Sequence, residues 1–374
     1  MQPNLLIHGD CRLALPKLAE TLAGRVRCAW IDPPYNTGNS KGRVFSYADD
    51  RGEQEWLDLM RSAATGLREL LRQDGSLFVQ LDDNMLDHAR LLLDEVFGRA
   101  QFIARVTVDA RAPSAFSTVN KGLFKSSEYL LWYARDRDAF RWTPQRVPRA
   151  PDPAYGLWLD DPSAPVEAWT LRPLRLVAQD RGLDPDLLRV RHADQVCRLA
   201  SISDTKSGKA IRELKAASEA SPDRVLRLER PGLEDQYLLR GQQLLFYAKQ
   251  VSVIDGVRTA SRPLTNVWTD IAWEGIAGEG GVRYKLGKKP ERLVRRCLQL
   301  ATDPGDVVVD CFLGAGTTAA VAQKMGRRWI GVERGPAIEL AAERLDRVCA
   351  GEDPSGVTKL EGYTGGGGFR RRAL

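Results

Sequence analysis

VVVDCFLGAGTT, at residues 307–318, is the most informative stretch of this 374-residue chain. Val307–Val309 form a short apolar run that predicts a buried strand, and Thr317–Met325 has the spacing of a helix. Glycines between them let a ligand approach the backbone closely, and the start of a helix offers free N–H groups. The stretch therefore predicts a strand, a glycine loop and a helix that form a ligand-binding turn of an α/β fold.

The residues after the glycine loop add a second strand and a carboxylate. Trp329–Val332 predicts the strand, and Glu333 ends it seventeen residues after Gly316. A carboxylate at this place commonly binds the two ribose hydroxyls of a nucleoside cofactor. The glycines alone also fit an NAD or flavin site, or a turn with a purely structural role. The strand, loop, helix, strand and Glu in this order favour a nucleoside cofactor.

Strands and helices alternate at both ends of the chain. Helical spacing occurs at Glu55–Leu71, Leu86–Phe97, Pro290–Leu300 and Ala337–Val348. Apolar strands are predicted in the first part of the chain at Leu5–His8, Arg27–Ile31, Ser76–Gln80, Phe102–Val108 and Glu128–Tyr133. This alternation predicts a parallel-sheet α/β domain.

The middle of the chain, residues 136–265, has a different composition. Proline and arginine are frequent there, and the strand–helix alternation is lost. Lys206–Ser218 has helical spacing, and a hairpin is predicted around Asp255-Gly256, between Gln242–Val253 and Gly256–Ala260. We predict an inserted domain at 136–265, between two parts of one α/β domain at 1–135 and 266–350. Residues 351–374, rich in glycine and arginine, predict a flexible tail.

A second candidate site, Asp32-Pro33-Pro34-Tyr35, directly follows the predicted strand Arg27–Ile31. Two prolines stop a strand and stiffen the turn, at the sheet edge where open α/β folds place ligands. The Asp32 carboxylate and the Pro33 carbonyl offer two acceptors for the N–H groups of an exocyclic amine, which stabilises positive charge on its nitrogen during attack. Tyr35 offers a ring on which a base stacks. A plain strand-ending turn is the alternative.

Composition limits the other functional classes. The chain is 43% apolar and 28% charged, as in globular proteins, and its net charge of +6 permits an anionic partner. Six cysteines without a C-x-x-C pair, and only three histidines, give little from which to build a metal site. No apolar run is long enough to span a bilayer, and the first residues do not have the pattern of a signal peptide. We expect a cytoplasmic protein without a metal or a membrane partner.

The two candidate sites together indicate a reaction. A nucleoside-cofactor loop and an amino-group clamp in one chain favour methyl transfer from S-adenosylmethionine to a base. The sulfonium methyl group is already activated, so this chemistry needs no metal.

The chain resembles the β class of amino-DNA methyltransferases, in which the catalytic motif precedes the recognition domain and the cofactor loop, and within it the Mod subunits of type III restriction systems. The stretches that carry this resemblance are His8–Asp10, Asp32–Gly38, Phe45–Trp56, Gly75–Asp83, Asp94–Gly98, Ser127–Ala134, Asn266–Asp270, Lys289-Pro290, Asp310–Thr318 and Gly362–Phe369. The resemblance implies a class I S-adenosylmethionine-dependent methyltransferase fold. That fold is a doubly wound, mostly parallel seven-stranded sheet, here with a target-recognition domain inserted between its halves.

The resemblance also assigns roles to residues. Asp32 and Pro33 would clamp the target amino group, Pro34 completes the motif, and Tyr35 would stack on a base flipped out of the duplex. The cofactor would be bound by Asp10 at its adenine, by Glu333 at its ribose and by Lys289-Pro290 beside its methionine end. The rest of its pocket would be formed by Asp310, Phe312, Gly314, Gly316 and Thr317.

The implied partner is double-stranded DNA of a prokaryotic cell, held at its phosphates by basic residues. The candidates are Arg111, Lys121, Lys125, Arg227, Arg230, Arg240 and Arg258. An Asp at the first clamp position favours adenine N6 over cytosine N4 as the target. A non-catalytic DNA-specificity subunit is the alternative from another class. The resemblance leaves open a homodimer and a restriction endonuclease as further partners.

Overall fold

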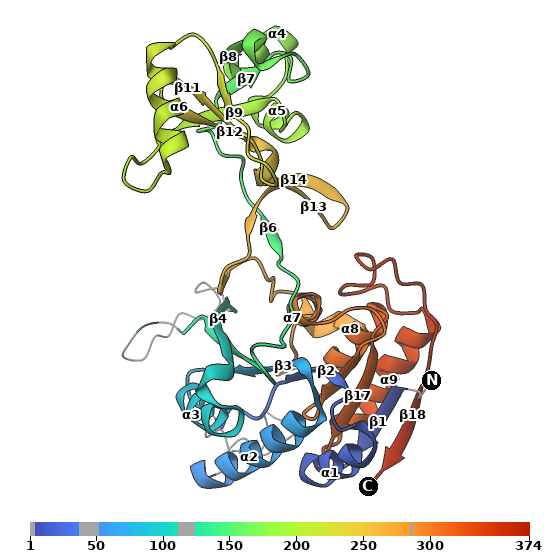
Figure 1. The fold of residues 1–374 in the computed structure, drawn as a ribbon. Helices are drawn as coiled ribbons and strands as arrows, with labels where there is room; N and C mark the ends of the chain where they lie inside the picture. Colours follow the sequence, from blue (N-terminus) through green and yellow to red (C-terminus); the bar gives the residue numbers. More distant parts are fainter. Residues whose placement is uncertain (1–3, 37–51, 111–122, 124, 285–286) are drawn as a thin grey trace. The chain divides into compact units, whose positions relative to one another are not determined.

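The computed structural model describes residues 4–36, 52–110, 123, 125–284 and 287–374 (Figure 1). The chain forms two compact units, one of residues 1–144 and 265–374 and the other of residues 145–264. Residues 136–144, predicted from sequence to begin the insert, pack on the first unit. Phe140 and Trp142 contact the ring of Trp132, and the Thr143 N–H donates to the Leu300 carbonyl at 2.9 Å.

The first unit is built around a mixed sheet of nine strands in the order β15-β4-β5-β3-β2-β16-β17-β1-β18. The strands are β1 (Asn4–His8), β2 (Val26–Ile31), β3 (Leu71–Leu81), β4 (Phe102–Asp109), β5 (Ser127–Ala134), β15 (Val267–Trp268), β16 (Val307–Asp310), β17 (Arg328–Glu333) and β18 (Phe369–Ala373). The strand β5 runs antiparallel to both of its neighbours, and the other pairings are parallel. The central seven strands are the sheet expected from the sequence, and β15 and β18 extend its two edges.

Helices cover both faces of this sheet, which confirms the doubly wound fold (Figure 1). The helices α1 (Cys11–Leu22), α2 (Glu53–Leu70) and α3 (Leu86–Phe97) pack on one face. The opposite face is covered by α7 (Glu291–Ala301), α8 (Thr317–Lys324) and α9 (Ala337–Ala350). Short 3-10 turns lie at η1 (Arg99–Gln101) and η5 (Ile276–Gly281).

Alternate side chains of the central strands enter the two layers. In β2, Ala29 and Ile31 join the core beneath α1 and α2, whereas Trp30 points to the opposite face and approaches Cys297 of α7. The whole of β2 is buried, as expected for a central strand covered on both faces. The two sites predicted at the ends of β2 and β16 are therefore held by buried strands in the middle of the sheet.

The second unit is a separate antiparallel structure. A six-stranded sheet has the order β10-β11-β12-β9-β7-β8, and a three-stranded sheet has the order β13-β14-β6. Ile254 pairs with Val257, so Asp255-Gly256 forms the two-residue turn that the sequence predicts. The elements are β6 (Arg146–Pro148), β7 (Leu157–Leu159), η3 (Val166–Ala168), β8 (Leu171–Pro173), α4 (Leu174–Arg181), α5 (Pro185–Arg191), β9 (Val196–Ala200), α6 (Lys209–Ala220), β10 (Leu226–Leu228), β11 (Gln236–Leu239), β12 (Gln242–Phe246), η4 (Tyr247–Gln250), β13 (Val251–Ile254) and β14 (Val257–Pro263).

The C-terminal segment differs from the flexible tail that its composition suggests. Residues 369–373 form β18, which pairs in parallel with β1 along its whole length. The pairing uses backbone groups, so the arginine side chains do not oppose it, and the Phe369 ring packs against Trp329. A sheet edge provides the partner that glycine and arginine content alone does not reveal.

Candidate functional site

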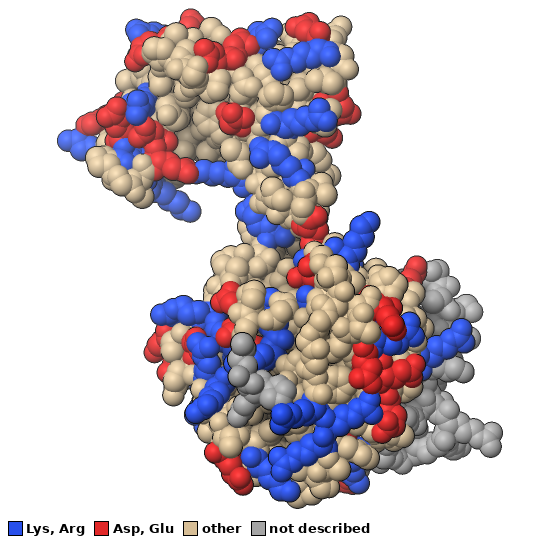
Figure 2. Space-filling view, turned by 90° about the vertical axis from the view of Figure 1, so that its right-hand side faces the viewer, with Lys and Arg blue, Asp and Glu red and all other residues tan. Residues whose placement is uncertain are grey.

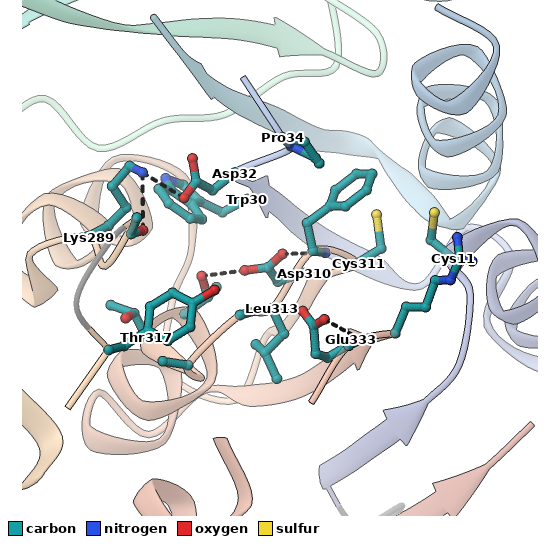
Figure 3. Close-up of a pocket in the computed structure, with 18 of the residues that line it drawn as sticks. Cys11, Trp30, Asp32, Pro34, Lys289, Asp310, Cys311, Leu313, Thr317 and Glu333 are labelled. Atoms are coloured by element: carbon teal, nitrogen blue, oxygen red, sulfur yellow. Dashed lines mark hydrogen bonds and ion pairs between the residues drawn. The ribbon is translucent and has the colours of Figure 1, made fainter. Parts of the chain in front are cut away.

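A cavity of about 340 Å³ lies at the carboxyl edge of the sheet in the first unit (Figure 3). Its walls come largely from the loops that follow β2, β16, β17 and β1, four strands that are consecutive in the sheet. The predicted site residues that line it are Asp10, Asp32, Pro34, Lys289, Asp310, Phe312, Gly314, Thr317 and Glu333. Pro33, Tyr35, Pro290 and Gly316 are their immediate neighbours in sequence and lie outside this lining. The fold thus brings residues from both ends of the chain into one cavity.

Asp310, at the end of β16, organises the glycine loop. Its Oδ1 accepts the Phe312 N–H at 2.9 Å, and its Oδ2 accepts the Thr318 hydroxyl at 2.7 Å. Burial raises the pKa of Asp310 to about 7, although these two donors oppose that rise. The carboxylate therefore fixes the course of the backbone around the cavity.

Gly316 and Gly314 serve different purposes in this loop. Gly316 has a φ of +82° at the N-cap of α8, and a Cβ there would lie 3.2 Å from Ala341. Its role is the sharp turn into the helix. Gly314 has a φ of +54° and lines the cavity, and a Cβ there would meet nothing within 4 Å, which leaves the backbone open to a ligand.

Glu333 closes the loop from the end of β17. Its Oε2 accepts the Gly314 N–H at 2.8 Å, and its Oε1 accepts the Gly335 N–H at 2.6 Å. A carboxylate has about four lone-pair sites, so each oxygen retains capacity for another donor. The side chain is held in one orientation at the cavity wall, as Figure 3 shows.

Asp10 forms the far wall of the cavity and caps α1. Its carboxylate accepts the Arg12 backbone N–H at 2.9 Å and the Arg12 guanidinium at 2.7 Å, and Arg334 lies at 3.4 Å. The Arg12 hydrogen bond lowers the pKa of Asp10 to about 2. An ionised Asp10 at this wall is thus a fixed hydrogen-bond acceptor.

The Asp32–Tyr35 turn is fixed by hydrogen bonds to side chains of two other elements. The indole N–H of Trp56, in α2, donates to the Pro34 carbonyl at 2.6 Å, and the Tyr35 hydroxyl donates to Glu128 at 2.9 Å. Burial raises the pKa of Asp32 to about 6, although Lys289 opposes this rise. The turn is therefore rigid, as its two prolines predict.

Lys289 lies against Asp32 rather than only beside the cofactor loop. Its Nζ donates to Asp32 Oδ2 at 2.7 Å and lies 4.8 Å from the centre of the Tyr35 ring. Pro290, the next residue, is the N-cap of α7. The sequence indicated Lys289 as a cavity residue, but it did not reveal this ion pair.

Two polar residues beside the Asp32–Tyr35 turn were missed by sequence reasoning. Glu128, in β5, accepts hydrogen bonds from Tyr35 at 2.9 Å and from Gln80, in β3, at 2.6 Å. Glu128 is 5% exposed and Gln80 is fully buried. The available signal was a polar residue inside each of two otherwise apolar strand runs.

A network of buried charged side chains lies next to the glycine loop and is hydrogen-bonded to Thr317 at the end of that loop. Lys324, in α8, donates to Glu291 at 2.8 Å and to Asp353 at 2.6 Å. Arg344, in α9, donates to the other oxygen of Glu291 at 2.7 Å and to the Thr317 hydroxyl at 2.8 Å. All four charged side chains of this network are at most 1% exposed, so it ties the starts of α7 and α8 together.

The basic residues predicted to contact DNA lie in varied settings. Lys125 lies 3.5 Å from Asp83, and Arg227 pairs with Asp235 at 2.7 Å. Arg240 and Arg258 donate to backbone carbonyls, and the Arg230 backbone N–H donates to Asp235. Arg111 and Lys121 lie outside the described residues. Figure 2 shows Lys and Arg interspersed with Asp and Glu over the face that it presents.

Among the described residues, no group of three or more His, Cys, Asp or Glu side chains is arranged to hold a metal ion. Within the same ranges no helix has the length and apolar character needed to cross a membrane.

Comparison with curated proteins finds relatives named as DNA-modifying enzymes. The "Probable type III restriction-modification enzyme HindVI Mod subunit" of Haemophilus influenzae is 29% identical over 98% of this chain and 53% of its own length. Type II methyltransferase M.EcaI of Enterobacter cloacae is 24% identical over 95% of this chain and 71% of its own length. The StyLTI Mod subunit of Salmonella typhimurium is 26% identical over 84% of this chain and 49% of its own length. The chain thus spans about half the length of the two Mod subunits.

Among solved structures, TTHA0409 of Thermus thermophilus complexed with S-adenosyl-L-methionine is similar over 100% of this chain and 98% of its own, with 16% identity and a TM-score of 0.46. At that TM-score the likeness has no weight in the assignment. The decisive match is to the family N6_N4_Mtase, described as DNA methylase, which extends over residues 26–344 and includes both the Asp32–Tyr35 turn and the glycine loop. This chain belongs to the N6_N4_Mtase family of DNA methylases.

Proposed function

We propose that this chain transfers the methyl group of S-adenosylmethionine to the exocyclic amino group of a base in double-stranded DNA, with adenine N6 as the target. One observation carries the proposal. β2 and β16 pair in parallel, with Val309 opposite Ala29, so Asp32 and Asp310 follow neighbouring strands and line one cavity. An amino-group clamp and a cofactor loop at one sheet edge suit methyl transfer between their ligands.

The residues of the cavity fit S-adenosylmethionine. Glu333 keeps capacity for two more donors after binding Gly314 and Gly335, which suits a pair of ribose hydroxyls. Phe312 provides an aromatic wall for the adenine end, and Asp10, whose oxygens already accept from Arg12 and Arg334, lines the same cavity. The bound cofactor would supply a methyl group already activated by its sulfonium.

The clamp residues would then act on the flipped base. Asp32 and the Pro33 carbonyl accept the two N–H groups of the amine, which favours a pyramidal nitrogen and stabilises the charge that develops on it. Tyr35 stacks on the base, a contact worth about 1–3 kcal/mol. The excess proton leaves to water after transfer, so a strong general base is unnecessary.

The choice of base is tested by mass spectrometry of nucleosides from DNA treated with the protein. We expect N6-methyladenine to appear in amounts that depend on added S-adenosylmethionine. Detection of N4-methylcytosine alone would overturn the adenine assignment and keep the methyltransferase assignment. Single-molecule sequencing of the same DNA would identify the recognition sequence.

The cofactor assignment predicts an effect of replacing Glu333 by glutamine. One carboxylate oxygen becomes an NH₂ group, which cannot accept the Gly335 or Gly314 N–H or a ribose hydroxyl. A lost charge-assisted hydrogen bond of about 1.5–3 kcal/mol corresponds to roughly 10- to 150-fold weaker binding of S-adenosylmethionine. Isothermal titration calorimetry measures it, with Glu339→Gln as the control because Glu339 is exposed on α9. Equal affinities in both variants would remove Glu333 from the site.

Partners and location are further parts of this proposal. The names of two relatives place them in type III restriction-modification enzymes, which supports an endonuclease partner for this chain. We also propose a homodimer, and activity in the cytoplasm of a prokaryotic cell, where the DNA substrate lies. Size-exclusion chromatography with light scattering, with and without DNA, measures the oligomeric state.

A further inference from the structure

A buried ammonium group lies inside the amino-group clamp. Lys289 is 5% exposed, and its Nζ donates to Asp32 Oδ2 at 2.7 Å and to the Gly287 carbonyl at 3.3 Å. The same Nζ lies 4.0 Å from Glu128 and 4.8 Å from the centre of the Tyr35 ring. This cation therefore contacts the carboxylate of the clamp and lies close to its aromatic ring.

The backbone on both sides of this ion pair is held in place. Asp32 directly follows the buried strand β2, and the Asp32–Tyr35 turn is held by Trp56 and Glu128. Lys289 is two residues before Glu291, which is fully buried between Lys324 and Arg344. Lys289 and Asp32 therefore lie next to buried, hydrogen-bonded parts of the unit.

The ion pair makes the two carboxylate oxygens of Asp32 different in their hydrogen bonding. Oδ2 is occupied by Lys289, whereas Oδ1 is buried and has no hydrogen-bond partner within the described part of the chain. A buried acceptor without a donor is costly unless a ligand satisfies it. A target amine needs an acceptor at this turn, and Oδ1 is the oxygen that remains for it.

We propose that Lys289 is a positioning residue for methyl transfer, whose ammonium holds Oδ2 of Asp32 so that Oδ1 stays an anionic acceptor for the target amine. This inference rests on the proposed function. It gives Lys289 a role at the clamp in addition to the cofactor side of the cavity.

Several charged and titratable groups face this ion pair. Glu128 of β5 and Tyr284 face Lys289. The Tyr35 hydroxyl faces the Asp32 carboxylate, and Asp310 of β16 faces Asp32 from the next strand. Burial lowers the pKa of Lys289, but Asp32 and Glu128 outweigh burial and raise it overall. Lys289 therefore remains a cation over the working range of pH.

The pKa of Asp32 determines whether activity is lost at low or at high pH. Burial raises the pKa of Asp32 to about 6, and Lys289 opposes that rise. Removal of the cation must therefore raise this pKa further. The protonated acid is a poorer acceptor, so activity that depends on ionised Asp32 appears only at higher pH in a variant without the charge.

The test compares Lys289→Met with Lys289→Arg. For the wild type, kcat/KM for DNA at saturating S-adenosylmethionine should have an acid limb near pH 6, the pKa of Asp32. In Lys289→Met this limb should move up by about one pH unit or more, so that activity falls roughly fivefold or more at pH 6 relative to pH 8.5. Lys289→Arg should restore the wild-type limb. Lys359→Met, an exposed site, controls for loss of one positive charge.

A second measurement needs neither DNA nor activity. Carbon-13 NMR of carboxyl-labelled aspartate, with the Asp32 signal assigned by its loss in Asp32→Asn, follows the titration of Asp32 directly. We expect its midpoint to rise in Lys289→Met. An unchanged midpoint, or a loss of activity that is equal at every pH, would overturn the inference while wild-type methylation leaves the proposed function standing. Absence of methylation by the wild type would instead refute the proposed function itself.

Discussion

Replacing Asp32 by alanine is expected to lower kcat for DNA methylation by about 100- to 1,000-fold, the usual cost of removing a group that stabilises transition-state charge. The variant loses both the acceptor for the amine and the partner of Lys289, which lies 2.7 Å away. Binding of S-adenosylmethionine should persist, because Asp310 and Glu333 hold the glycine loop without help from Asp32. Transfer of a tritiated methyl group measures the rate, and calorimetry measures cofactor affinity.

The matched control for this substitution is Asp346→Ala. Asp346 is 61% exposed on α9 and pairs only with Arg371 among the ion pairs of the described residues, and exposed pairs contribute about 0–1 kcal/mol. Its kcat should equal that of the wild type. If Asp32→Ala methylates DNA at the wild-type rate, the Asp32–Tyr35 turn is not the amino-group clamp. If Asp32→Ala loses cofactor binding as well, its loss of activity does not report on the clamp.

Replacing Lys324 by methionine is expected to destabilise the first unit by about 3–5 kcal/mol, since it leaves buried carboxylates without their cation. Lys324 has a fully buried side chain between Glu291 and Asp353, whose side chains are at most 1% exposed. Glu291 keeps Arg344 as a partner at 2.7 Å, whereas Asp353 loses the cation that lies 2.6 Å from it. Urea unfolding followed by circular dichroism measures the change in the free energy of unfolding.

Two further variants serve as comparisons for the stability of Lys324→Met. Lys17→Met, at an exposed position of α1, should change the free energy of unfolding by no more than about 0.5 kcal/mol. The double variant Lys324→Met/Asp353→Asn should recover part of the loss, because it removes one unpaired charge. A destabilisation below about 1 kcal/mol in Lys324→Met would show that the network contributes little to the fold.

The sequence predicted those features of the fold that depend on the backbone preferences of neighbouring residues. The Asp32–Tyr35 prolines and the 310–318 glycines mark strand ends, and strand ends of a parallel sheet meet at one edge. The fold that the resemblance implies makes these two strands neighbours, and the β2–β16 pairing agrees with it. Glu333 was predicted from its place at the end of a strand, whereas the roles of Asp10 and Asp310 came from the family resemblance, and all three line the cavity.

The remaining features depend on distant side chains that no local pattern specifies. Glu128 looked like part of an apolar strand, and its contact with Tyr35 requires the antiparallel pairing of β5 with β3. Lys289 resembled a cofactor residue because only its sequence neighbours were visible. The antiparallel sheets of residues 145–264 are assembled from three- to seven-residue strands, too short for a clear period.

The order of the strands has a consequence for how the chain folds. Leu5 pairs with Ile330, and Cys28 pairs with Val308, so β1 and the outer side of β2 acquire their neighbours only after β16 and β17 have left the ribosome. Residues 145–264 have their own contacts and can fold in the meantime. Until then the apolar strands of the first half have unsatisfied edges, the condition in which nascent chains aggregate. Late pairing between residues so far apart in sequence also implies slow folding, so synthesis of this chain should depend on chaperones more than its size suggests.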